Sequence, residues 1–546
     1  MIDVINYLIL AAFIIRTVRN VFYHTFLWQL KEYRKDRYIA HLRSRQGKKL
    51  LFGLVTILKW ILFLFIVSIV FSPTSKFPNS LIQGVTSFAY YSLWLIFIVE
   101  ALLNIRELRT RGWRIPIFTP KIVVILAFVF FLQFGSLFSG LIFAPLILSP
   151  FLDKILAPSV AFILLILNIP SALYRKIIVI AAKKKIANCK DLKVIGITGS
   201  YGKTSTKEIL SAILSENFSV LKTQEYQNTD IGVANTILRK LNTSHEVFVV
   251  EMGAYKQGEI KGISEIVHPE IGVITGISQQ HLELFGSIEN IIRTKFELIE
   301  SLPQDGVVFL NGENVYLRDL VKRANKYVKD VIYYRIDSYI SNTNLFKDKI
   351  DFTYIEEKKR YQMTAHILGI HLLENVLCAI LVARKLGLSI VQIKNGLAKF
   401  FPSLQTMRPY QYSKQTTLVD NTFNTNQIGV LASLEYMKLY KGKKVLVFTP
   451  IIELGKEVSF TVHKELAKKI SYMCDYFVLT NNNATLAVLN GIDSTSINKD
   501  KVRVLGPNDT VRLIREEILG IPDSIVIFEG KEARASLKLL LPTYGY

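Results

Sequence analysis

The sequence has 546 residues, a formal net charge of +23 and 20% charged residues. This length is too great for one hydrophobic core and predicts three or four domains. The three cysteines lie far apart and form no CxxC pair, which argues against a disulfide framework and against a cysteine-ligated zinc site. Many of the basic residues flank apolar runs and do not alternate with aromatic residues, so we expect no nucleic-acid partner.

Long apolar runs dominate the first third of the chain. A helix that crosses a bilayer needs roughly 20 mostly apolar residues. Strongly basic segments alternate with nearly neutral loops between these runs, which is the positive-inside pattern. We therefore expect a transmembrane helical domain over residues 1–185, in contact with membrane lipid. This pattern predicts a multi-pass protein of the cytoplasmic membrane with its catalytic domains in the cytoplasm. The candidate spans are residues 4–23, 51–71, 82–104, 122–147 and 156–180. The first has the shortest apolar core, and an amphipathic helix that lies at the membrane interface is the open alternative for it.

A phosphate-binding loop is predicted next, where residues 194–210 read VIGITGSYGKTSTKEIL. Glycines let backbone N–H groups approach a phosphate, and the following helix offers its positive N-terminus. Lys203 would bind the β- and γ-oxygens of a triphosphate, and the Thr204 hydroxyl would reach Mg²⁺. The usual spacing places glycine where this chain has Ile197, so the loop is short. The predicted nucleotide-binding residues are Thr198, Gly199, Ser200, Tyr201, Gly202, Lys203, Thr204 and Ser205.

Two further side chains could hold a metal ion beside this loop. Glu251 ends the apolar strand VFVVE, and His281 follows the next apolar strand. A strand-end carboxylate and an imidazole can bind Mg²⁺ together, because this ion keeps several waters and needs few protein ligands. Without its neighbours, a histidine such as His281 is more often structural than a ligand, and a lysine such as Lys295 is more often a solvated helix residue.

The loop Thr-Gly-x-x-Gly-Lys-Thr resembles that of the Mur ligases, which are ATP-dependent amide-forming enzymes of bacterial cell-wall synthesis. Residues 222–238, 247–260 and 274–299 resemble the MurF branch, which adds D-alanyl-D-alanine. The resemblance covers roughly residues 190–546. It implies an ATP-binding central domain over 190–402 and a Rossmann-like C-terminal domain over 403–546. Apolar runs near 416–420, 444–449, 476–480 and 524–528 predict four strands of the C-terminal domain. The expected fold is therefore an N-terminal α-helical transmembrane domain followed by α/β domains.

The resemblance also implies the site residues. ATP and two Mg²⁺ ions would be bound, with Lys295 carbamylated by CO₂ so that it becomes a carboxylate-like ligand. The implied metal ligands are Thr204, Glu251, His281 and Lys295. The implied catalytic residues are Lys203, Lys295, His281 and Asn424. Further implied nucleotide contacts are Asn375, Arg408, Asp420 and Asn421.

The C-terminal motifs depart most from the family. The family loop Asp-Asp-x-Tyr-Asn-x-Asn-Pro reads DNTFNTNQ at residues 420–427, so Asn421 stands where the family has an aspartate. An amide can still hydrogen-bond a ribose hydroxyl. Glu529 stands where the family often has the lysine of Lys-Gly-Ser-Arg. This domain is the one that should select the incoming amine.

By resemblance the protein is an ATP-dependent acid–amino-acid ligase that works through an acyl phosphate. The expected substrates are a UDP-N-acetylmuramoyl-peptide or a lipid-linked precursor, and D-alanyl-D-alanine. Other cell-wall enzymes are expected partners. Three alternatives stay open: a membrane-anchored ligase similar to poly-γ-glutamate synthetases, a non-catalytic nucleotide-binding membrane paralogue, and a nucleotide-regulated transporter.

Overall fold

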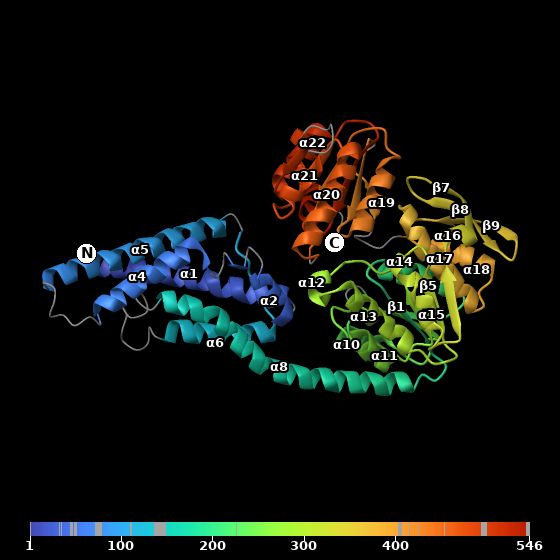
Figure 1. The fold of residues 1–546 in the computed structure, drawn as a ribbon, viewed down its shortest axis with the longest axis horizontal. Coiled ribbons are helices and arrows are strands. Elements are labelled where there is room, and N and C mark those ends of the chain that lie inside the picture. Colours follow the sequence, from blue (N-terminus) through green and yellow to red (C-terminus); the bar gives the residue numbers. More distant parts are fainter. Residues whose placement is uncertain are drawn as a thin grey trace. The chain divides into compact units, whose positions relative to one another are not determined.

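The computed structural model describes most of the chain and divides it into two compact units, residues 1–176 and 177–546. Each unit has its own hydrophobic core. Figure 1 colours the helical first unit blue to teal, and the α/β second unit green to red. The residues outside the description are 1, 32, 34, 44–46, 49–51, 71–78, 110–111, 136–148, 225–226, 402–406, 414, 424, 453, 493–498 and 542–546.

The first unit is α-helical. Helix α5 packs on α1 and α4, and α1 also packs on α6. Helix α6 begins where Thr119 caps it and Pro120 occupies its first turn, which is the usual place for proline in a helix. The helices are α1 (Ile2–Leu30), α2 (Lys35–Arg43), α4 (Leu54–Val70), α5 (Asn79–Arg109), α6 (Pro120–Phe134) and α8 (Ser149–Ala187), the last of which continues into the second unit.

The prediction of a multi-pass membrane protein is wrong. Among the described residues, one helix, Lys154–Ala187, is long and apolar enough to cross a membrane. The apolar helices Leu54–Ser68 and Pro120–Phe134 are shorter than a span requires. An apolar run in the sequence reports composition and does not by itself fix the length of the helix that it forms. The expected span over 122–147 includes residues outside the description.

An ion network links three helices of the first unit. The Glu100 carboxylate of α5 accepts from the Lys59 ammonium of α4 at 2.7 Å and lies 2.8 Å from Nε of Arg16 on α1. Both cations are buried and lie over the Phe97 ring, at 4.9 Å and 4.4 Å from its centroid. Buried charges are tolerated when they are paired, so this network fixes how α1, α4 and α5 pack.

The second unit begins with a parallel six-stranded sheet in the order β2-β3-β1-β4-β5-β6. Its strands are runs of Val, Ile and Phe that are buried on both faces, as a parallel sheet covered by helices requires. The strands are β1 (Lys193–Thr198), β2 (Val220–Lys222), β3 (Val247–Glu251), β4 (Ile271–Ile274), β5 (Val307–Asn311) and β6 (Asp330–Tyr334).

Helices connect these strands and cover the sheet. Because β1 pairs in parallel with β3 and with β4, the carboxyl ends of the three strands meet at one edge. Helix α9 follows β1, α10 follows β2 and α11 follows β3. The helices of this domain are α9 (Lys203–Leu214), α10 (Asp230–Lys240), α11 (Glu259–Val267), α12 (Leu282–Phe285), α13 (Ile288–Glu300), α14 (Val315–Arg318), α15 (Leu320–Ala324) and α16 (Ile336–Tyr339).

A small antiparallel sheet, β7-β8-β9, and two helices complete the central domain. Helices α17 and α18 both pack on α9, and α17 also packs on β5 of the large sheet. The elements are β7 (Ile340–Leu345), β8 (Ile350–Glu356), β9 (Lys359–Ala365), the 3₁₀ helix η3 (Ile370–Leu372), α17 (Leu373–Lys385) and α18 (Ile390–Lys399).

The C-terminal domain has a second six-stranded sheet, in the order β10-β11-β15-β12-β13-β14, with β10 antiparallel to the rest. Its strands are β10 (Arg408–Gln411), β11 (Thr416–Asn421), β12 (Lys444–Phe448), β13 (Tyr476–Leu479), β14 (Val502–Val504) and β15 (Ser524–Glu529). Its helices are α19 (Gln427–Met437), α20 (Lys456–Met473), α21 (Thr485–Ile492), η4 (Lys499–Lys501), α22 (Pro507–Glu517) and α23 (Arg534–Leu540). The four strands expected from the sequence are present.

Candidate functional site

The predicted phosphate loop connects β1 to α9, as the sequence pattern requires. Gly199 has φ +151°, and a Cβ on it would lie 2.1 Å from Oγ1 of Thr275. Gly202 has φ +78°, and a Cβ on it would lie 2.7 Å from Oδ1 of Asn375. Both positions therefore need glycine, because of the left-handed backbone and because neighbouring side chains pack directly against it.

Lys203 and Thr204 open helix α9 at this loop. Lys203 Nζ donates to the carbonyl of Gly199 at 2.7 Å, so the ammonium lies over the loop itself. Burial lowers the pKa of Lys203, while the nearby Glu251 carboxylate acts in the opposite direction. Oγ1 of Thr204 donates to Oε2 of Glu251 at 3.0 Å. The loop lysine and the loop threonine thus both lie at the predicted phosphate loop, and their roles toward a phosphate and a metal ion stay predictions.

Glu251, at the end of β3, is held from several sides. Its Oε1 accepts from Nδ2 of Asn228 at 3.1 Å, and its backbone N–H donates to Oγ1 of Thr223 at 3.0 Å. Its Oε2 lies 3.4 Å from the ammonium of Lys207. The carboxylate is buried, and an amide, a hydroxyl and an ammonium surround it. Together with the Thr204 hydroxyl it supplies oxygen ligands of the kind that Mg²⁺ prefers.

His281 and Lys295 lie on the segment that follows β4. His281 has φ +61°, and its ring packs edge-on against Tyr255 with the centroids 5.0 Å apart. Lys295 is buried on α13, and burial together with the charge of Lys203 lowers its pKa to about 7. The sequence alone favoured a solvated lysine at this position, and the structure shows a buried one.

Within the parts of the chain that the structure describes, no group of three or more His, Cys, Asp or Glu side chains is close enough to hold a metal ion. The structure brings Thr204 and Glu251 together and places Lys295 within electrostatic reach of Lys203. The metal-binding roles of His281 and Lys295 stay predictions.

A layer of polar side chains supports the loop from the other side. Nδ2 of Asn314 donates to the Tyr201 hydroxyl at 3.0 Å, and Nδ2 of Asn311 donates to Glu374 at 2.6 Å. Asn375 follows Glu374 on α17 and contacts Gly202. Burial raises the pKa of the Tyr201 hydroxyl to about 12, so it stays protonated. These contacts place Asn375 beside the nucleotide loop, where the resemblance implies an adenine contact.

In the C-terminal domain, Arg408 and Asp420 face each other across the antiparallel pair β10–β11. Asp420 is buried, and its Oδ1 accepts from the backbone N–H of Thr422 at 3.0 Å. Burial raises the pKa of Asp420, while Thr422, Arg534 and Arg408 counteract that rise. Asn424, the remaining predicted catalytic residue, lies outside the described residues.

Asn421 and Glu529, two of the positions that depart from the family pattern, are partners in the β11–β15 register. Nδ2 of Asn421 donates to Oε1 of Glu529 at 2.8 Å, and the Ser433 hydroxyl of α19 donates to the same oxygen. Glu529 is completely buried, which raises its pKa to about 7. The Asn421 amide and the Glu529 carboxyl are therefore hydrogen-bond partners, and both depart from the family pattern.

This pair predicts a pH-dependent stability. The pKa of Glu529 is higher in the folded protein than its ordinary value, so the folded state binds more protons than the unfolded state. The free energy of unfolding should therefore fall as the pH rises from about 4.5 to 7, by at most about 3 kcal/mol. Glu529→Gln should flatten this part of the pH profile, measured by hydrogen exchange in β11 and β15. The matched control is Glu532→Gln, because that side chain is exposed. Equal slopes in the wild type and in Glu529→Gln would contradict the prediction.

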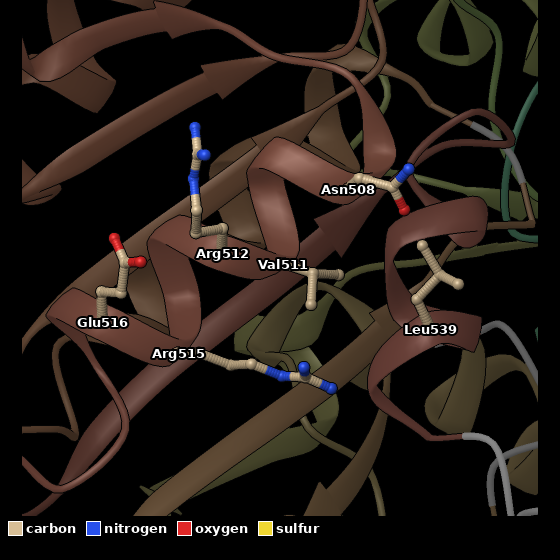
Figure 2. A pocket seen from close by; sticks show the side chains of 6 residues that line it. All are labelled: Asn508, Val511, Arg512, Arg515, Glu516 and Leu539. Carbon is tan, nitrogen blue, oxygen red and sulfur yellow. The ribbon is translucent and has the colours of Figure 1, made fainter.

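A surface pocket of the C-terminal domain lies between α22 and α23 (Figure 2). Arg512 at its edge lies 3.3 Å from Asp509 in an exposed pair, which contributes little to stability. The pocket shares no residue with the predicted site, so we assign it no role in the chemistry. It is lined by Asn508, Val511, Arg512, Arg515, Glu516 and Leu539.

Sequence reasoning missed the side chains that hold Glu251 in place. Asn228 lies inside residues 222–238, which resemble the family, but the sequence does not show which side chain it contacts. Lys207 lies one helical turn after Lys203, among apolar residues that pack inward, and a lysine on a buried helix face is a detectable signal. The partnership of Asn421 with Glu529 could not be found, because the two residues are 108 positions apart.

Comparison with known proteins identifies the central domain. Residues 197–383 match the model of the Mur ligase middle domain. The UDP-N-acetylmuramoyl-tripeptide–D-alanyl-D-alanine ligase of Synechocystis sp. is 31% identical over 316 residues, which are 56% of this chain and 66% of that protein. The ligase of the same name from Escherichia coli K12 is 29% identical over 268 residues, which are 48% of this chain and 59% of that protein. The chain thus spans about six tenths of the length of these curated relatives.

Solved structures match a larger share of the chain than these relatives do. MurF from Acinetobacter baumannii has a TM-score of 0.60 and 25% identity, over 67% of this chain and 80% of that chain. The MurF ligase of Thermotoga maritima, solved in complex with ADP, has a TM-score of 0.59 and 22% identity, over 67% of this chain and 83% of that chain, and shows the shared fold. These similarities give no support to a place in the cytoplasmic membrane. The chain is therefore a Mur ligase-like protein, with a Mur ligase middle domain in residues 197–383 and similarity to the MurF branch.

Proposed function

We propose that this protein is an ATP-dependent ligase that joins a carboxylate to an amine in cell-wall precursor synthesis. The observation that carries the proposal is the contact of Thr204 with Glu251 beside Lys203, inside the region that matches the Mur ligase middle domain. By analogy with the relatives' names, the substrates are a UDP-N-acetylmuramoyl-tripeptide, or a lipid-linked precursor, and D-alanyl-D-alanine.

The chemistry divides into two steps. The substrate carboxylate attacks the γ-phosphorus of ATP, which releases ADP and leaves an acyl phosphate. The amine then attacks the acyl carbon, and the tetrahedral intermediate collapses to an amide and inorganic phosphate. Lys203 neutralises charge on the transferred phosphoryl group, and the loop backbone holds the phosphates in line with the attacking oxygen. Binding both substrates in one site holds the reacting atoms in a fixed orientation, so that a bimolecular reaction becomes effectively unimolecular.

The residues present fit a divalent cation. Glu251 and Thr204 offer oxygen atoms that are already in contact, and Mg²⁺ favours such ligands. Bound there, Mg²⁺ would neutralise negative charge on the phosphate oxygens. A second ion would draw on His281 and Lys295. Asn375 and Arg408 would contact the nucleotide, and Asp420 and Asn421 would complete the binding from the C-terminal domain.

The surroundings of Lys295 also fit carbamylation. CO₂ reacts with an uncharged amine, and the lowered pKa of this buried lysine keeps a large fraction uncharged near neutral pH. Protein equilibrated with ¹³C-bicarbonate should show a carbamate carbon by NMR, and Lys295→Arg should remove it. Lys261→Arg is the control, because Lys261 is an exposed lysine of the same domain. A wild-type spectrum without the signal would contradict this part of the proposal.

The function itself is tested by phosphate release from the full chain with ATP. Three pairs of a donor carboxylate and an amine should be compared with ATP alone. The pairs are the UDP-tripeptide with D-alanyl-D-alanine, the lipid-linked precursor with the same dipeptide, and a glutamate peptide with glutamate. Release that requires the first or second pair supports the proposal, and a mass increase of the donor identifies the amide. Release that requires glutamate would favour a poly-γ-glutamate type of ligase. Nucleotide binding without release for any pair would favour a non-catalytic paralogue.

A further inference from the structure

Lys207 is a buried lysine for which the proposed chemistry has no role. It lies on α9, one helical turn after Lys203, and none of its surface is exposed. Its Nζ lies 3.4 Å from Oε2 of Glu251 and 3.3 Å from Oε1 of Glu208. Within the described residues this ammonium makes no hydrogen bond of good geometry. Burying a lysine in this way is costly unless its charge has a specific counter-charge.

The contacts define a short chain of alternating charges. Lys222 on β2 pairs with Glu208, which pairs with Lys207, which pairs with Glu251. Lys222 is exposed to solvent, whereas Lys207 and Glu251 are buried. The four formal charges cancel, so the network is neutral when no metal ion is bound. Adding a divalent cation at Glu251 changes that balance.

Lys207 is not placed to bind a phosphate. It lies a full turn below the loop, its side chain is completely covered, and its ammonium points to Glu251 and Glu208. Lys203 already lies at the loop, where its ammonium donates to the carbonyl of Gly199. The carboxylate that Lys207 contacts is the same one that Thr204 contacts, with both on Oε2.

We propose that Lys207 is a positioning residue that neutralises Glu251 before a divalent cation binds, and that its fixed charge sets the affinity of the site for that cation. The inference rests on the proposed function, because it takes Glu251 as the metal ligand. A cation held by Glu251 would carry a charge of the same sign as the Lys207 ammonium, which contacts that carboxylate, and would bind against its repulsion. Glu208 weakens that repulsion by drawing the ammonium away from Glu251.

Substitutions of Lys207 and of Glu208 should change the Mg²⁺ affinity in opposite directions. Lys207→Met removes the charge and keeps an unbranched side chain of similar length, so Mg²⁺ should bind on the order of tenfold more tightly. Glu208→Gln frees the lysine to oppose the cation more strongly, so Mg²⁺ should bind several-fold more weakly. Lys207→Arg keeps the charge and should stay close to wild type. A purely structural lysine would lower stability in Lys207→Met without tightening cation binding.

The measurement uses the full chain and a fluorescent, non-hydrolysable ATP analogue, with free Mg²⁺ varied. The readout is the Mg²⁺ concentration that gives half-maximal analogue binding, and no amide-forming substrate is needed. Lys222→Met is the matched control, because it removes a lysine from the exposed end of the same network and should change the value less than twofold. Circular dichroism checks that each variant is folded.

The outcomes separate this inference from the proposed function. If the wild type responds to Mg²⁺ and Lys207→Met and Glu208→Gln shift the midpoint in opposite directions, the role of Lys207 is supported. If both variants match wild type, or if both weaken binding, the role of Lys207 is overturned while the ligase proposal stands. If analogue binding to the wild type is independent of Mg²⁺, the metal site at Glu251 is overturned and this inference with it.

Discussion

Lys203→Ala should lower ATP-dependent phosphate release by a factor of about 10² to 10³. Its ammonium lies over the loop, 2.7 Å from the Gly199 carbonyl, where a triphosphate would be held. Removing one preorganised donor from a site that stabilises developing charge costs about 3–4 kcal/mol in the transition state. The effect should fall mainly on turnover, because the loop backbone still provides N–H groups for nucleotide binding. Steady-state phosphate release and analogue binding, measured on the same samples, separate these two effects.

Lys240→Ala provides the matched control for this loss. Lys240 is an exposed lysine at the end of α10 in the same domain, so its removal changes the net charge equally and touches no predicted site residue. Hydrogen exchange in β1 and α9 tests whether the loop of Lys203→Ala is still folded. A folded Lys203→Ala protein that keeps more than half of the wild-type turnover would contradict the nucleotide site.

Glu100→Gln should destabilise the first unit by about 3–5 kcal/mol. The substitution removes the carboxylate that pairs with both Arg16 and Lys59, two buried cations beside Phe97. Loss of one partner from a buried ion network is far more costly than loss of an exposed pair, because the remaining charge cannot reach water. Hydrogen exchange of the full chain should show faster exchange in α1, α4 and α5, by roughly a hundredfold or more.

Glu107→Gln is the control on the same helix. Glu107 pairs with Arg19 at 3.2 Å, and both side chains are partly exposed, at 36% and 27%. An exposed pair of this kind contributes roughly 0–1 kcal/mol. Exchange in α1 and α5 should therefore change little. If Glu107→Gln and Glu100→Gln had equal effects, the burial of the Arg16–Glu100–Lys59 network would not be what stabilises these helices.

Much of the second unit follows from local sequence. The phosphate loop needs only contiguous residues, because an apolar strand, two glycines and a helix N-terminus come one after another in the chain. Gly199 and Gly202 adopt the backbone that their lack of a side chain allows. The four strands expected in the C-terminal domain were likewise visible as short apolar runs between helices.

The first unit shows where local sequence misled. Apolar runs predicted five membrane spans, but hydropathy reports composition and not where a helix begins or ends. Among the described residues one helix meets the length and the composition that a span requires. Arg16, Lys59 and Glu100 lie on three different helices, so the sequence could show the charges but not their pairing.

The sequence by itself determined the nucleotide loop, the α/β domains and the family they resemble, because each depends on neighbouring residues in a fixed order. Tertiary structure decided which side chains surround Glu251. Thr204 and Asn228 reach it from positions 47 and 23 residues away, and Lys207 approaches it from α9. It also paired Asn421 with Glu529 through the register of β11 and β15. Burial and charge balance arise only when distant segments pack together, so no local pattern contains them.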